Sequence, residues 1–237
     1  MSQPESQSKD APRYRHYVSL LGLIAFVALT LGALLAKTSG FSGLRPGQHA
    51  PPFAVPLAAA SLEGDANIAT HSHEGQAGAK PACTVRGAQI LNICELYEHH
   101  PVVLALFVDG GDCTKILDEL QALARSMPSV RFAAVAIRGQ RASLRALVAK
   151  RRLTIPVGYD RDGALAGLYR LASCPQVDFI YPGGALQSVP PALTPPLAQL
   201  RMHASELLAG SAASQHAPAS SHTGAAKAPP RGRARGG

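Results

Sequence analysis

Four cysteines, at positions 83, 94, 113 and 174, are the residues of this 237-residue chain whose chemistry is most specific. None of them forms a Cys-x-x-Cys pair, so any thiol–disulfide chemistry needs cysteines that the fold brings together. Four cysteines allow three complete pairings, and spacing alone leaves all three open.

Two of the cysteines stand where the chain changes its character. Cys113 follows the apolar run Pro101–Val108 and precedes a stretch with helical periodicity, for which Asp112 is the expected N-cap. The amide groups at a helix N-terminus stabilise a thiolate, so Cys113 has a physical reason to be reactive. Cys174 directly precedes Pro175, and a β-branched and aromatic run follows, which is typical of a tight turn leading into a buried strand.

The elements that position these cysteines alternate between strands and helices. A hairpin is expected over Ala82–Ile93, with its bend near Gly87. On the helix expected over residues 141–150, the cations are expected to face water; they are Arg141, Arg145 and Lys150. The other expected strands cover residues 101–108, 130–137, 155–159, 176–181 and 185–189, and the expected helices cover residues 113–127, 141–150, 164–169 and 197–208. Alternation predicts a parallel sheet with right-handed crossovers, to which the late strands add an antiparallel edge.

The segment Tyr17–Ala36 is an uncharged apolar run, and as a helix it would be about 30 Å long, enough to cross a bilayer. Basic residues precede it, so residues 1–16 are expected in the cytoplasm and the rest of the chain outside the cell. We expect an uncleaved signal anchor in the cell membrane, with cleavage after Ala36 or Gly40 as the alternative.

The flanks also explain the charge of the chain. The formal net charge is +8, yet residues 46–208 contribute only +1, which argues against a nucleic-acid partner. We expect a linker over residues 37–46, one folded domain over 47–208 and a disordered basic tail over 209–237, whose Ala, Pro, Ser and Arg content cannot form a core.

Two stretches of the expected domain resemble the thioredoxin superfamily, and most closely its extracytoplasmic redoxin branch, which includes TlpA-like proteins and the AhpC/TSA domain. Ile155–Pro175 is similar to the family stretch that holds a Pro-Val pair, an Asp-x-x-Gly turn, a tyrosine and a closing cis-proline. Gly47–Phe53 resembles the start of the family's domain. The resemblance implies an α/β fold, a three-layer α/β/α sandwich with a mixed sheet, and a cis peptide bond before Pro175.

The resemblance also implies roles for the cysteines. In this fold the cis-proline loop packs against the start of the helix that carries the active cysteine, which favours a Cys113–Cys174 pair. Cys113 would attack, Cys174 would resolve the mixed disulfide, and Pro175 would fix the loop along which a substrate peptide lies. Cys83 and Cys94 would then form a structural disulfide. No metal or other cofactor is implied.

We therefore expect a membrane-anchored, extracytoplasmic thiol–disulfide oxidoreductase that acts on cysteine-containing exported proteins or in a membrane thiol relay. One alternative is a degenerate binding or structural module whose disulfides are only structural. Another is a redoxin-type thiol peroxidase of the AhpC/TSA kind, although no threonine precedes Cys113 at that family's spacing. A redox site should leave at least one sulfur accessible, whereas a structural disulfide should be buried.

Overall fold

The computed structural model describes residues 20–27, 43–64, 66–67, 80–171, 173–187 and 196–216. The chain divides into two compact units, Met1–Gly43 and Leu44–Gly237. In the first unit residues 20–27 are helical and their large apolar side chains are exposed. Among the described residues no helix combines the length and the apolar character needed to span a membrane. Most of the expected segment Tyr17–Ala36 lies outside the described residues, so the span stays a prediction.

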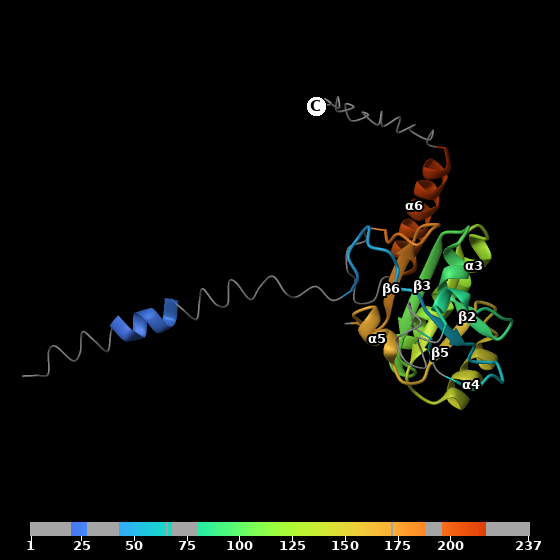
Figure 1. Cartoon of the computed structure of the whole chain (residues 1–237), viewed down its shortest axis with the longest axis horizontal. Coiled ribbons are helices and arrows are strands. Elements are labelled where there is room, and N and C mark those ends of the chain that lie inside the picture. Colours follow the sequence, from blue (N-terminus) through green and yellow to red (C-terminus); the bar gives the residue numbers. More distant parts are fainter. Residues whose placement is uncertain are drawn as a thin grey trace, which may run out of the picture. The chain divides into compact units, whose positions relative to one another are not determined.

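The second unit is built on a four-stranded mixed sheet (Figure 1). Its strands are β3 (Val102–Phe107), β4 (Arg131–Ile137), β5 (Val157–Asp160) and β6 (Gln176–Ile180), in the order β5-β4-β3-β6. β3 is parallel to β4, β4 is parallel to β5, and β6 is antiparallel to β3. Every residue of β3 is buried, as a continuous apolar run in a covered central strand requires.

Helices cover both faces of this sheet. The helices α3 (Ile116–Ser126), α4 (Arg141–Arg151) and α6 (Leu197–His216) contribute leucines to one core cluster. The short helices α2 (Ile93–Tyr97) and α5 (Ala164–Leu168) pack into the cluster on the other face. Figure 1 shows α3 and α5 on opposite sides of the sheet. The mixed sheet and its two helical layers agree with the expected α/β architecture.

The segment between Ala82 and Ile93 differs from the expected hairpin. It holds the 3₁₀ helix η2 (Ala82–Thr84) and the strand β2 (Ile90–Asn92), which pairs antiparallel with β1 (Ala54–Pro56) instead of with its own neighbour. The hairpin prediction was wrong because a disulfide from Cys83 to Cys94 and the Asn92 side chain fold this segment into a compact turn.

Two further boundaries differ near the C-terminus. The expected strand 185–189 is reduced to isolated bridges, His49 with Ala185 and Ile180 with Leu186, and residues 188 and 189 lie outside the described residues. Helix α6 continues to His216 instead of ending at residue 208. Ser211 is buried and its hydroxyl donates to the Leu207 carbonyl, so the helix still packs against the core where the tail was expected to begin. Residues 217–237 lie outside the described residues.

Arg141 was also misjudged as a solvated cation. Its side chain is only 14% exposed. The guanidinium donates to the backbone carbonyls of Leu57, Ala60 and Leu62, and thereby holds the loop that follows β1 against the start of α4. Arg145, on the next turn, donates to the Ala60 carbonyl as well.

Candidate functional site: a disulfide at the sheet edge

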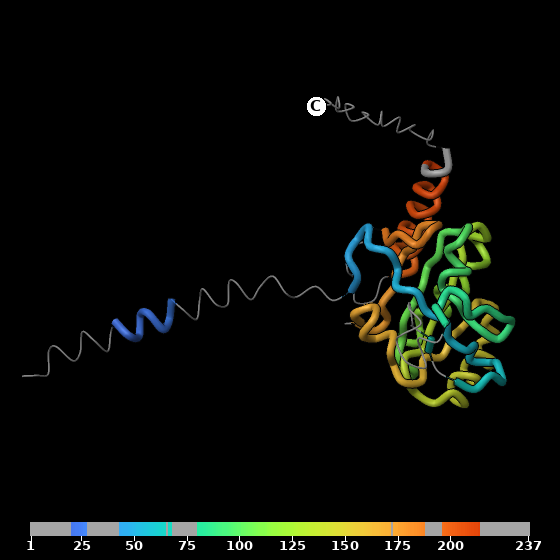
Figure 2. The backbone as a smooth tube through the Cα atoms, in the orientation of Figure 1, coloured from blue at the N-terminus to red at the C-terminus, as the bar shows by residue number. Residues whose placement is uncertain are grey.

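The antiparallel pairing of β6 with β3 brings two distant parts of the chain to one edge of the sheet (Figure 2). Leu106, near the end of β3, lies opposite Gln176, the first residue of β6. The turn before β6 therefore lies beside the residue that follows β3, and the Val108 amide donates to Cys174 Sγ at 3.2 Å. The Cys174–Pro175 peptide bond is cis, as the resemblance implied.

Two glycines carry the chain from β3 to Cys113. Gly110 has φ +124° and Gly111 has φ +56°, both in the left-handed region that side chains disfavour. They allow a sharp turn into the 3₁₀ helix η3 (Gly111–Lys115), which carries Cys113 and continues into α3 at Ile116.

This turn corrects the expected helix start. Cys113 is not the first residue of an α-helix but lies in the 3₁₀ turn before it. Asp112 caps nothing with its side chain. Its carboxylate is exposed and pairs with Lys115 Nζ at 2.9 Å. The negative charge of Asp112, beside Cys113, is therefore paired with the positive charge of Lys115.

A disulfide joins Cys113 to Cys174, whose Cα atoms are 5.3 Å apart although 61 positions separate them in the sequence. Both residues are partly exposed. Cys174 also packs against the core cluster under α3, so the bond lies at the margin of the core. Cys113, Cys174 and Pro175 are therefore together at the carboxyl edge of β3, and their catalytic roles stay a prediction.

The second disulfide joins Cys83 to Cys94 with a Cα–Cα distance of 5.4 Å. Cys94 is buried and Cys83 is partly exposed. The buried Asn92 accepts hydrogen bonds from the Cys94 and Glu95 amides and donates to the Ala82 and Val85 carbonyls. This local network encloses the disulfide, and its structural role stays a prediction.

A buried polar group follows the cis-proline on β6. Gln176 Nε2 donates to Asp178 Oδ2 at 3.1 Å and to the Tyr169 carbonyl at 3.2 Å. Desolvation raises the pKa of Asp178 to about 6, and the hydrogen bond from Gln176 opposes that rise only in part. Burial, and then the nearby Asp178, raise the pKa of Tyr169 well above its usual value; its hydroxyl donates to the Pro51 carbonyl.

Among the residues that the structure describes, no group of three or more His, Cys, Asp or Glu side chains is arranged to hold a metal ion. The chemistry that this edge can perform with its own atoms is exchange between thiols and disulfides, because its reactive atoms are two bonded sulfurs.

Several residues around these sites were not predicted from the sequence. Asn92 carried a signal, since an asparagine directly before a helical segment is a typical N-cap. Asp178 carried one too, because an acid between Val177 and Phe179 interrupts an apolar strand. Arg151, which contacts the turn that carries Cys113, carried none, because a basic run at a helix end usually faces water.

Comparison with known proteins relates this architecture to solved structures. No family model matches the chain, and no curated protein matches it in sequence. A provisionally assigned protein disulfide isomerase from Bacteroides thetaiotaomicron superimposes with a TM-score of 0.52 at 15% identity, covering 74% of this chain and 98% of that one.

Two proteins from Chlorobium tepidum are similar. A provisionally assigned thiol:disulfide interchange protein DsbE has a TM-score of 0.51 at 15% identity, covering 70% of this chain and 97% of its own. A thiol:disulfide interchange protein of the thioredoxin family has a TM-score of 0.50 at 11% identity, covering 70% and 99%. At these identities the likeness concerns the fold, and the chain accordingly has the thioredoxin-like α/β fold with a mixed sheet.

Proposed function

We propose that this protein is a thiol–disulfide oxidoreductase of the extracytoplasmic redoxin branch that acts through Cys113 and Cys174. The observation that carries the proposal is the disulfide between them, which is partly exposed at the carboxyl edge of β3 and is followed by a cis-proline. The structural neighbours described above include thiol:disulfide interchange proteins, which supports the same reaction class for this chain.

The reaction would proceed by two exchanges. In the reduced protein the Cys113 thiolate attacks a substrate disulfide, forms a mixed disulfide and releases one substrate sulfur as a thiolate. Cys174, once deprotonated, attacks Cys113 Sγ, closes the Cys113–Cys174 bond and releases the second substrate thiolate. Two electrons thus pass from the protein dithiol to the substrate, and the reverse sequence oxidises a substrate dithiol. A dithiol or disulfide partner must restore the starting state.

The loop before β6 suits this role physically. The Val108 amide already donates to Cys174 Sγ, and a donor at that position also stabilises a thiolate there. Cys174 can therefore leave or attack as an anion without moving away from its hydrogen-bond partner. Pro175 holds the backbone beside the bond, where an extended substrate peptide would lie.

The central test is the Cys113→Ser variant in a disulfide exchange assay with a labelled peptide disulfide and glutathione. We expect the exchange rate of Cys113→Ser to fall to the uncatalysed rate. A Cys174→Ser variant should accumulate a stable mixed disulfide through Cys113. The Cys83→Ala/Cys94→Ala protein is the matched control and should keep its exchange activity. If Cys113→Ser exchanges as fast as the unmodified chain, the assignment is wrong and a binding module with structural disulfides becomes the better description.

We further propose that Tyr17–Ala36 anchors the protein in the cell membrane with the domain outside, where disulfides persist and exported proteins with cysteines are the available substrates. The full chain should then stay in the membrane fraction after alkaline carbonate washing, and protease added outside should remove the domain. Release of the domain by the wash would instead support cleavage of the segment.

A further inference from the structure

One arginine reaches from the far end of α4 to the turn that carries Cys113. Arg151, the last residue of α4, donates from Nη1 to the Thr114 carbonyl at 2.6 Å and from Nη2 to Thr114 Oγ1 at 2.9 Å. Nη1 also lies 3.0 Å from Asp118 Oδ2 on α3. The Arg151 side chain is 24% exposed, so these hydrogen bonds are only partly accessible to water.

Thr114 connects Arg151 to the turn that carries Cys113. It directly follows Cys113, it is buried, and its hydroxyl donates to the Gly111 carbonyl at 3.1 Å. The hydroxyl therefore uses its proton on Gly111 and its lone pair on Arg151. The glycines that precede Cys113 leave this turn with little conformational preference of its own, so contacts from outside the turn contribute to the position of Cys113.

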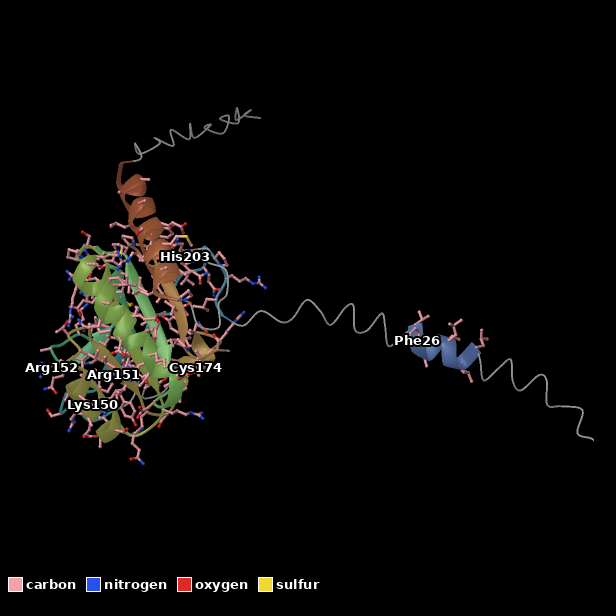
Figure 3. All side chains as sticks on the ribbon, turned by 180° about the vertical axis from the view of Figure 1, so that it is seen from behind. Phe26, Lys150, Arg151, Arg152, Cys174 and His203 are labelled. Carbon is pink, nitrogen blue, oxygen red and sulfur yellow. A yellow bond between two sulfur atoms is a disulfide. The ribbon has the colours of Figure 1, made fainter. Side chains whose placement is uncertain are left out.

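The contact is specific to one of three consecutive basic residues. Lys150, Arg151 and Arg152 end α4 and are labelled in Figure 3. Within the described part of the chain, only Arg151 of the three makes a side-chain hydrogen bond or ion pair. Lys150 and Arg152 are exposed. The planar fork of arginine is what allows one side chain to serve a carbonyl, a hydroxyl and a carboxylate together.

We propose that Arg151 is a positioning residue for Cys113, which holds η3 in place through Thr114 and brings a positive charge to the residue next to the reacting sulfur. The inference rests on the proposed function for its meaning. When the disulfide opens, the turn keeps its place because Arg151 holds it from α4, and the cation favours the thiolate over the thiol. Asp118 takes up part of that charge, so the effect is smaller than that of an unpaired arginine.

The experiment measures the alkylation rate of Cys113 in the reduced full chain between pH 4 and 9, with each cysteine resolved by mass spectrometry. Arg151→Met removes the charge and the fork but keeps the length of the side chain. It should raise the pH midpoint of Cys113 alkylation by about one unit. Alkylation at pH 6 should then slow about threefold, since a more basic thiolate is also a better nucleophile. Lys150→Met, which removes one charge from the same helix end, should leave both values unchanged.

Arg151→Lys separates position from charge. A single ammonium cannot reach all three acceptors, so its midpoint should lie between those of the unmodified chain and Arg151→Met. If Arg151→Met does not fold, Arg151→Lys against Lys150→Met carries the test. Equal midpoints for the Arg151 and Lys150 variants would overturn the inference. The readout needs no substrate protein, so it remains decisive even if Cys113→Ser shows that the domain does not catalyse exchange.

Discussion

The two disulfides of this domain lie in opposite kinds of surroundings. Cys83 and Cys94 are separated by 11 positions and enclose a turn that Asn92 also holds with four hydrogen bonds. Cys113 and Cys174 are separated by 61 positions and join a glycine-rich turn to the loop before β6. The first bond lies within a turn that hydrogen bonds of Asn92 also hold, whereas the second joins two loops that are held by separate contacts.

The polar groups on β2 and β6, the strands next to the two bonds, also differ. Asn92 uses its side-chain oxygen and its nitrogen, and all of its partners are backbone groups. Asp178, on the strand that follows Cys174, has one side-chain donor, Gln176, and its pKa is raised to about 6 because desolvation outweighs that bond. The polar group near the first bond therefore has its partners in the backbone, whereas the carboxylate that follows the second bond depends on one side-chain donor and is costly to desolvate.

The largest effect expected from this comparison concerns stability without each disulfide. Loop entropy alone predicts a stabilisation of about 3 kcal/mol for Cys83–Cys94 and about 4 kcal/mol for Cys113–Cys174. The proposed function predicts the reverse order, because a bond that is readily reduced stabilises the fold little. We expect Cys83→Ala/Cys94→Ala to lose about 3 kcal/mol and Cys113→Ala/Cys174→Ala to lose only about 1 to 2 kcal/mol in urea unfolding.

Reduction of the unmodified domain is the control, since it opens the same bonds without changing a side chain. In glutathione or dithiothreitol buffers Cys113–Cys174 should open at a potential well above about −300 mV, while Cys83–Cys94 stays closed. If both bonds resist reduction until the domain unfolds, the order set by loop length holds, and both disulfides are structural.

How far the sequence could predict this arrangement depends on the kind of interaction. β3 and β4 were predictable because continuous apolar runs encode burial on both faces. The cysteine pair at the sheet edge, with its cis-proline, came from the resemblance around Ile155–Pro175, since no local pattern links Cys113 to Cys174.

What the sequence did not predict depends on single side chains that reach across the fold. The pattern after Asp112 is compatible with an α-helix, but the chain forms a 3₁₀ turn at Cys113, after two glycines with positive φ and in contact with Arg151 from α4. Arg141 was misjudged for the same reason, because its carbonyl partners lie about 80 positions earlier in the chain.

A second prediction tests whether Asn92 holds the Cys83–Cys94 turn. Asn92→Ala leaves the Ala82 and Val85 carbonyls and the Cys94 amide without their partner, and should destabilise the domain by about 2 to 3 kcal/mol in thermal unfolding. Asn92→Asp keeps the acceptor oxygen but loses both N–H donors, so its melting temperature should lie between those of the unmodified domain and Asn92→Ala. An unchanged melting temperature in Asn92→Ala would mean that the disulfide alone fixes the turn.

The smallest expected effect is a gain in stability when Asp178, on the strand that follows Cys174, is replaced. The pKa of Asp178 is raised from 3.8 to about 6 in the folded domain, so between these values the folded state binds more protons than the unfolded state. The free energy of unfolding should therefore fall as pH rises from about 4 to 6 and then stay level. Asp178→Asn removes this loss. The full shift corresponds to about 3 kcal/mol, but an amide must also be desolvated, so we expect a gain of about 1 to 2 kcal/mol at pH 7.

Urea unfolding of the oxidised domain at pH 3.5, 5 and 7 measures this difference. The gain should be smallest at pH 3.5, where the carboxyl is protonated in the folded state and mostly protonated in the unfolded state, and largest at pH 7. Asp112→Asn is the control, because it removes an exposed carboxylate beside Cys113 and should not remove the slope. If Asp178→Asn instead destabilises the domain at pH 7, the carboxylate is favoured in the folded state. The hydrogen bond from Gln176 would then outweigh the desolvation of Asp178, and the contrast between the two sites would rest on the disulfides alone.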